Sequence, residues 1–159
     1  MKLHPFNLAA GVCLFAGAAS ACWSDIPLEE VISRSPTIVV GKIERIKVAE
    51  PPASTPEGLY TTTPPAFAFD IAYIRVSKIL KKKTTDIDVK EGKEIPLSMP
   101  SVRNETRVST DIIYPQGMEG VWILSRSDKD TTFSATYPKD FQPLEKESNI
   151  AAIVAKQKN

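Results

Sequence analysis

Thr37-Ile38-Val39-Val40-Gly41-Lys42-Ile43-Glu44-Arg45-Ile46-Lys47-Val48 (residues 37–48) is the stretch that decides the fold class of this chain. Its β-branched composition is typical of a strand buried on at least one face. Val39, Gly41 and Ile43 alternate on one phase, whereas Ile46 and Val48 fall on the other. This slip predicts a β-bulge at Glu44-Arg45, and Gly41 permits a sharp bend or a close approach of another backbone. We therefore expect a curved strand.

The rest of the chain carries similar but shorter signals. Alternating or β-branched patterns predict four further strands, at residues 66–80, 95–99, 119–125 and 131–137. The first of these is so long that it must curl or serve two sheets. Ser127-Asp128-Lys129-Asp130 supplies turn residues for a hairpin between the last two strands. The connections are a proline-rich loop at 50–65, a charged turn at 81–93 that begins with three lysines and is expected to be solvated, and a loop without periodicity at 101–118.

A short helix is expected at each end of the domain. Residues 27–34 have Pro27 near the first helical position and Ser24 or Asp25 as the cap. Ser148 caps a second helix, whose apolar stripe should pack on the strands. Five strands with terminal helices predict a mainly-β fold, a five-stranded, partly open barrel of the oligonucleotide/oligosaccharide-binding (OB) type. The alternative, a β-sandwich, normally shows about seven strands.

The first 21 residues have the pattern of an export signal. Lys2 and His4 precede an apolar stretch at residues 8–19, and Ala19-Ser20-Ala21 offers a small-residue cleavage site. As a helix, the apolar stretch spans only about 18 Å, well short of the roughly 30 Å hydrocarbon core of a bilayer. We expect a mature chain of residues 22–159, folded as a single domain that is secreted or held in the periplasm or cell envelope.

The composition of this mature chain excludes several kinds of chemistry. Cleavage removes the only histidine and leaves Cys22 as the only cysteine. This excludes Ser-His-Asp and Cys-His nucleophile systems, histidine- and cysteine-based zinc sites and an internal disulfide. Cys22 can still be a free thiol or pair with a cysteine of another chain. No motif places a Ser-Lys or two-carboxylate hydrolase. We predict no catalytic, cofactor-binding or metal-binding residue, and hence no enzyme.

The charge balance bears on the partner. The chain has 20 Lys and Arg against 19 Asp and Glu. A nucleic-acid-binding protein usually shows a basic excess, because much of its affinity comes from phosphate contacts. We therefore expect no nucleic-acid partner.

Several of these segments together resemble a known family. Cys22 after a small residue, the short helix, the strand at residues 38–43 and Gly120-Val121-Trp122-Ile123-Leu124 are similar to secreted netrin-like domains, of which the tissue inhibitors of metalloproteinases are the best-known members. In those inhibitors the terminal cysteine binds the zinc of a target protease through its α-amino group and carbonyl oxygen. The resemblance implies that role for Cys22. This chain departs from the family in having Cys22-Trp23-Ser24 instead of Cys-x-Cys, so it resembles a cysteine-poor, bacterial form.

Three functional hypotheses follow. The first is an exported binding module whose long loops contact a protein partner, with a glycan as the other ligand class. Tyr60 and Tyr114 lie in these loops and are the candidate ligand contacts, whereas Trp122 is expected in the core. The second is a metalloprotease inhibitor that acts through a free Cys22 terminus. The third is an envelope protein anchored by a lipid on Cys22, and this is the only case in which we expect membrane contact. Acylation would block the amino group of Cys22, so the lipid anchor and the protease inhibitor exclude each other.

Overall fold

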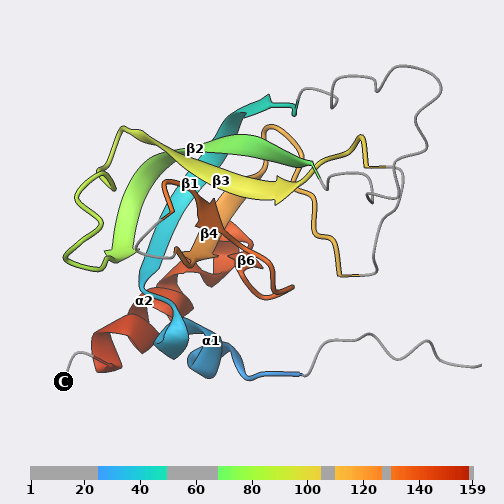
Figure 1. Cartoon of the computed structure of the whole chain (residues 1–159). Coiled ribbons are helices and arrows are strands. Elements are labelled where there is room, and N and C mark those ends of the chain that lie inside the picture. Colours follow the sequence, from blue (N-terminus) through green and yellow to red (C-terminus); the bar gives the residue numbers. More distant parts are fainter. Residues whose placement is uncertain (1–24, 50–67, 105–109, 127–129, 158–159) are drawn as a thin grey trace, which may run out of the picture.

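A computed structural model describes residues 25–49, 68–104, 110–126 and 130–157. One sheet of six strands, in the order β5-β3-β2-β1-β4-β6, curls into a half-barrel, with the two α-helices together on one side (Figure 1). The elements in chain order are α1 (Leu28–Arg34), β1 (Thr37–Lys47), β2 (Phe69–Lys81), β3 (Glu94–Pro100), β4 (Glu119–Leu124), β5 (Phe133–Ser134), β6 (Phe141–Gln142), the 3₁₀-helix η1 (Leu144–Lys146) and α2 (Glu147–Lys156). The mainly-β prediction is confirmed.

β1 is the central strand of the sheet, and it is irregular as expected. It pairs antiparallel with β2 on one side and with β4 on the other. Its register with β2 shifts between Ile43 and Arg45, which confirms the predicted bulge. The close approach expected at Gly41 is also present, because a Cβ there would lie 2.6 Å from the carbonyl oxygen of Arg75.

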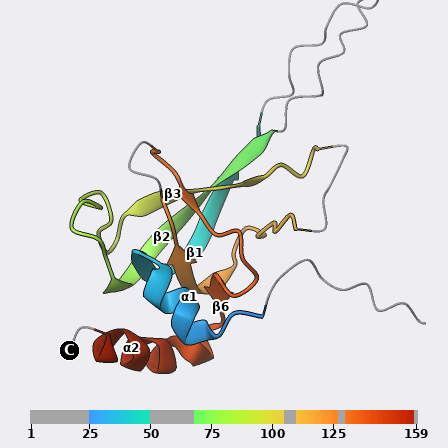
Figure 2. The ribbon, with the colours of Figure 1, turned by 60° about the horizontal axis from the view of Figure 1, so that its bottom comes forward.

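The apolar residues of β1 and β4 are buried on both faces of the sheet. Inside the curl, Val39 and Ile43 pack in one cluster with Trp122. On the opposite face, Ile38 and Val40 belong to a second cluster, to which α1 and α2 contribute their buried residues. Figure 2 shows the two helices below the sheet, at the end of the molecule that holds the C-terminus. Burial on both faces explains the continuous apolar runs at Ile38–Val40 in β1 and Val121–Leu124 in β4.

The terminal helices form where the sequence predicts them, but neither has the predicted cap. Pro27 is the N-cap residue of α1, and no side chain caps the helix. The Asp25 carboxylate instead lies 2.6 Å from Nζ of Lys139. α2 is entered from η1 and begins at Glu147, so Ser148 lies inside its first turn. In both cases the path of the preceding chain, and not a capping side chain, sets the start.

The edges of the sheet differ most from the prediction. The strand expected at 131–137 is reduced to β5, which pairs in parallel with β3. An antiparallel bridge between Ser134 and Ser125, the residue after β4, connects this segment to β4. The expected turn residues 127–129 lie outside the described residues. β6 pairs with β4 and gives the sheet six strands where five were expected. Two-residue strands carry too short a pattern to be found from alternation.

Residues 82–93, between β2 and β3, close the end of the half-barrel where β1 begins. Val89 from this connection is fully buried in the cluster inside the curl. Asp86 is buried, accepts a hydrogen bond from the Thr37 hydroxyl and lies 2.6 Å from the guanidinium of Arg126, which also pairs with Asp88 at 2.6 Å. The expectation of a solvated loop is therefore wrong for part of this connection, because a core residue and a buried ion pair hold it in place.

The basic run at the start of that connection is partly engaged as well. Nζ of Lys81 donates to the carbonyl oxygens of Ile32 (2.9 Å) and Ser33 (3.2 Å), at the C-terminal end of α1. Burial lowers the pKa of Lys81. Nζ of Lys82 donates to the carbonyl oxygen of Val89 at 3.1 Å. Lys81 and Lys82 thus tie the connection to its neighbours.

Candidate functional site

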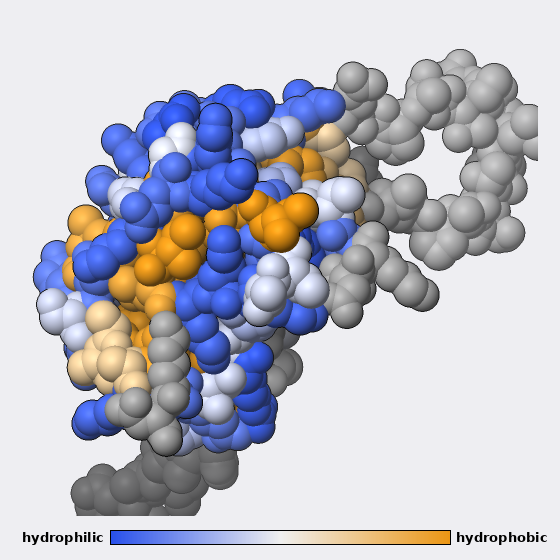
Figure 3. All heavy atoms as spheres, turned by 90° about the vertical axis from the view of Figure 1, so that its left-hand side faces the viewer, coloured by the Kyte–Doolittle hydropathy of each residue, from blue (hydrophilic) through white to orange (hydrophobic). Residues whose placement is uncertain are grey.

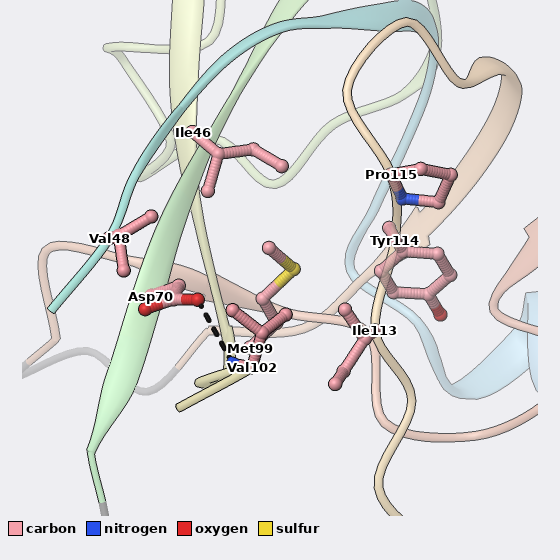
Figure 4. Close-up of a pocket in the computed structure, with 8 residues that line it drawn as sticks. All are labelled: Ile46, Val48, Asp70, Met99, Val102, Ile113, Tyr114 and Pro115. Carbon is pink, nitrogen blue, oxygen red and sulfur yellow. Dashed lines mark hydrogen bonds between the residues drawn. The ribbon is translucent and has the colours of Figure 1, made fainter. Parts of the chain in front are cut away.

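A pocket of about 290 Å³ lies at the opposite end of the half-barrel, where β1 ends, β2 begins and β3 ends. Ile46 in β1 and Val48 just after it form one wall, and Ile113, Tyr114 and Pro115 form the facing wall (Figure 4). The remaining lining residues, which lie between these walls, are Asp70, Met99 and Val102. We call this hollow the loop-base pocket, because it lies where the connections after β1 and after β3 begin.

A buried carboxylate joins these two connections. Asp70 has no exposed surface. Its Oδ1 accepts the backbone N–H of Ala49 at 2.8 Å. Its Oδ2 accepts the backbone N–H of Val102 at 3.2 Å (Figure 4). Asp70 is the one carboxylate among the described residues that line the pocket, and the backbone engages both of its oxygens. This arrangement compensates the burial of its charge with hydrogen bonds.

Further hydrogen bonds strengthen the same junction. The Asn104 side chain donates to the carbonyl oxygen of Ala68 at 3.0 Å and accepts its N–H at 3.1 Å. Arg103 donates to the carbonyl oxygen of Ala49 at 3.3 Å. The two long loops that the sequence predicts at 50–65 and 101–118 thus have their bases on the same side of the molecule.

Tyr114, a predicted ligand contact, is part of the pocket wall and of the core at once. Only 4% of its surface is exposed, and its hydroxyl donates to the carbonyl oxygen of Ala135 at 3.1 Å. Its ring meets Trp122 edge to face at a centroid distance of 5.0 Å. Burial, with a smaller contribution from the charge of Asp140, raises the pKa of Tyr114, so the hydroxyl stays protonated. Trp122 is fully buried and donates to the carbonyl oxygen of Gly41 at 2.8 Å, which confirms its core position.

The other predicted site residues cannot be placed. Cys22 and Tyr60 lie outside the described residues. Sequence reasoning missed Ile46 and Val48 as pocket residues, although their change of phase after the bulge is the signal that could have found them. It also missed Asp70, because its position within an alternating strand gives no sign of what the carboxylate binds.

The chemistry of the pocket favours an apolar, uncharged group. Seven of its eight lining residues are apolar or aromatic, and the charge of Asp70 is already compensated. Within the described part of the chain, no cluster of three or more His, Cys, Asp or Glu side chains is arranged to hold a metal ion. The arrangement can bind and position a side chain, and it offers no nucleophile with an adjacent base.

Elsewhere on the surface, apolar residues form a band between hydrophilic ones on the face at the left of Figure 1 (Figure 3). Ile87, in the connection between β2 and β3, is 75% exposed.

No helix among the described residues is long and apolar enough to cross a membrane.

The comparison with protein-family models finds no match for this chain, and the comparison with curated proteins finds none either. The resemblance to netrin-like domains therefore stays a prediction from the residues.

Proposed function

We propose that this protein is an exported, non-enzymatic binding module that holds a segment of a protein partner at the loop-base pocket. The observation that carries the proposal is an apolar hollow with exposed apolar residues at its rim. Val48 and Val102 line it and are 37% and 48% exposed. Burial of such a rim against a partner is favourable by roughly 25 cal/mol per Å² of apolar surface.

The size and lining of the pocket favour a protein side chain over a glycan. Its volume of about 290 Å³ lies at the lower limit of small-molecule pockets, which measure about 300–1,000 Å³. A glycan ligand would need exposed ring faces and free polar groups, but the Tyr114 ring is buried and both Asp70 oxygens are engaged. An aliphatic or aromatic side chain fits this environment, and such anchors dominate the energetics of protein interfaces.

We also propose that the half-barrel is an OB-like barrel of netrin-like character, with β6 as an addition. Support comes from the neighbouring order β3-β2-β1-β4, from the parallel pairing of β3 with β5, and from the bridge between Ser125 and Ser134 that connects β4 to β5. In OB folds the connection between the first two strands commonly takes part in ligand binding. Here that connection leaves β1 beside the loop-base pocket.

The test is selection of peptides from a random displayed library on the mature protein, repeated with two variants. Val102→Asp places a charge at the pocket rim, and Ile87→Asp is the matched control at the other end of the half-barrel. We expect peptides with a large apolar residue whose affinity falls at least tenfold with Val102→Asp and is unchanged with Ile87→Asp. Equal affinity for both variants, or no enriched peptide, would refute the proposal.

One observation favours a second candidate, inhibition of a metalloprotease through Cys22. The chain just after the terminus is held without a disulfide, because the Ile26 N–H donates to the Tyr137 hydroxyl at 3.0 Å and Lys139 donates to the Ile26 carbonyl oxygen at 2.6 Å. Inhibition of a zinc endopeptidase that disappears when one residue is added before Cys22 would support this function. This second function requires a free amino group on Cys22, which the intact mass of the native mature protein tests. A lipid adduct on Cys22 would leave no free amino group and would identify a lipid-anchored protein instead.

A further inference from the structure

We propose that the partner segment binds as an extended strand whose backbone pairs with residues 112–114, while one of its side chains enters the loop-base pocket. This inference rests on the proposed function and specifies the form of the partner. It is carried by the backbone on the two walls of the pocket.

The first wall is a stretch of chain outside the helices and strands, in which the backbone N–H and C=O groups of residues 112–114 have no hydrogen-bond partner among the described residues. Residues 111–115 run without helix, turn or bend. Among the described residues, no hydrogen bond engages the backbone N–H or C=O of Ile112, Ile113 or Tyr114. Ile113 and Tyr114 also line the pocket, so these open groups lie directly beside an apolar surface.

The second wall is the end of β1. The pairing of β1 with β4 ends at Lys42 and Glu119. One residue further, the backbone of Ile43 still bonds that of Gly117 (2.8 Å) and Met118 (2.9 Å). Pairing with β2, however, continues to Lys47. The last residues of β1 therefore have a strand neighbour on one side only within the described part of the chain, and Ile46 from this stretch lines the pocket.

These two walls together define the chemistry of the partner. An exposed strand edge is a template for another extended chain, because main-chain hydrogen bonds supply affinity while pockets for alternate side chains supply specificity. Here Ile113 and Tyr114, whose backbone groups have no hydrogen-bond partner among the described residues, line a pocket for one side chain (Figure 4). Because the one carboxylate in the lining is already engaged, the inserted side chain is uncharged and apolar.

The first experiment measures amide hydrogen exchange of the full mature protein by NMR, free and with a peptide selected as above. In the free protein we expect fast exchange at Ile112, Ile113 and Tyr114. The peptide should slow exchange at least tenfold at alternate positions, either at Ile112 and Tyr114 or at Ile113. The Ile123 amide, which donates to the carbonyl oxygen of Asp140 at 2.7 Å, should be slow in both states and serves as the control.

The second experiment methylates the backbone nitrogens of the same peptide one at a time. We expect a loss of affinity of at least tenfold at alternate positions and little change between them. A peptide that depends on Val102 but protects none of the three amides and tolerates every methylation would overturn this inference and leave the proposed function intact. Failure to obtain any Val102-dependent peptide overturns both, and tighter binding of a decanoate probe than of any peptide would identify an acyl chain as the occupant instead.

Discussion

At the end of the half-barrel where β1 begins, the connection of residues 82–93 inserts Val89 into the core and is fastened to Arg126 by two carboxylates. At the end where β1 finishes, the carboxylate of Asp70 binds backbone N–H groups, and the apolar walls around it enclose an open pocket. Both ends bury a carboxylate, but only the first also supplies a side chain that fills the space. Under the proposed function, we expect the filled end to contribute stability and the hollow end to contribute binding.

The largest effect is expected from removing the cation at the filled end. Arg126→Met leaves the buried Asp86 carboxylate without its cationic partner and removes the guanidinium that lies 4.2 Å above the Phe133 ring. We expect a loss of about 3 kcal/mol in the free energy of unfolding. Urea unfolding followed by tryptophan fluorescence measures it.

The matched control is Arg75→Met, which breaks ion pairs of an arginine whose side chain is 51% exposed. It should cost less than about 1 kcal/mol. Equal losses in the free energy of unfolding for the two arginine variants would show that the buried Arg126–Asp86 pair does not stabilise the filled end.

The corresponding change at the hollow end is Asp70→Asn. The amide group can accept only one of the two backbone N–H groups and turns its own N–H₂ toward the other. We expect a loss of about 1–3 kcal/mol from an unsatisfied buried donor, together with faster exchange of the Ala49 or Val102 amide. Asp130→Asn, at an exposed position, is the control and should change neither the free energy of unfolding nor the exchange of these amides. If Asp70→Asn leaves both amides protected, Asp70 does not hold the two connections together.

A smaller effect is expected from acid. Hydrogen bonding from Arg126 is the main cause that lowers the pKa of Asp88 in the folded protein. The stability contributed by this pair is therefore complete above the unfolded-state pKa of about 3.9 and is lost as the pH falls below it. Because the Asp88 side chain is 47% exposed, the contribution is at most about 1 kcal/mol.

Unfolding measured between pH 7 and pH 3 tests this sign. The difference in stability between the parent and Asp88→Asn should shrink as the pH falls. A difference that grows toward low pH would contradict the assignment.

The smallest effects on stability should come from the exposed apolar residues at the two ends. Val102→Asp and Ile87→Asp are each expected to change the free energy of unfolding by no more than about 0.5 kcal/mol. Thermal unfolding of both variants checks this. A much larger loss with Val102→Asp would mean that the rim supports the fold and is not a free binding surface.

The sequence predicted those parts of the fold that depend on local pattern. The curved central strand, its bulge near Glu44 and the core position of Trp122 all follow from alternation over several residues and are confirmed. The two-residue strands β5 and β6 were not predicted with their pairing, because partners distant in the sequence, not local propensity, hold them in the sheet. Tyr114 was selected as a loop aromatic, and the structure explains its burial by contact with Trp122.

The sequence by itself determined a mainly-β domain, because β-branched alternation and helix boundaries are properties of neighbouring residues. The tertiary structure decided where the candidate site lies. Asp70 bonds residues 21 and 32 positions away, and the walls of the pocket come from β1, β3 and the chain before β4. The hydrogen-bond donors of a buried carboxylate depend on which distant backbone segments the fold places beside it, and no local sequence pattern predicts them.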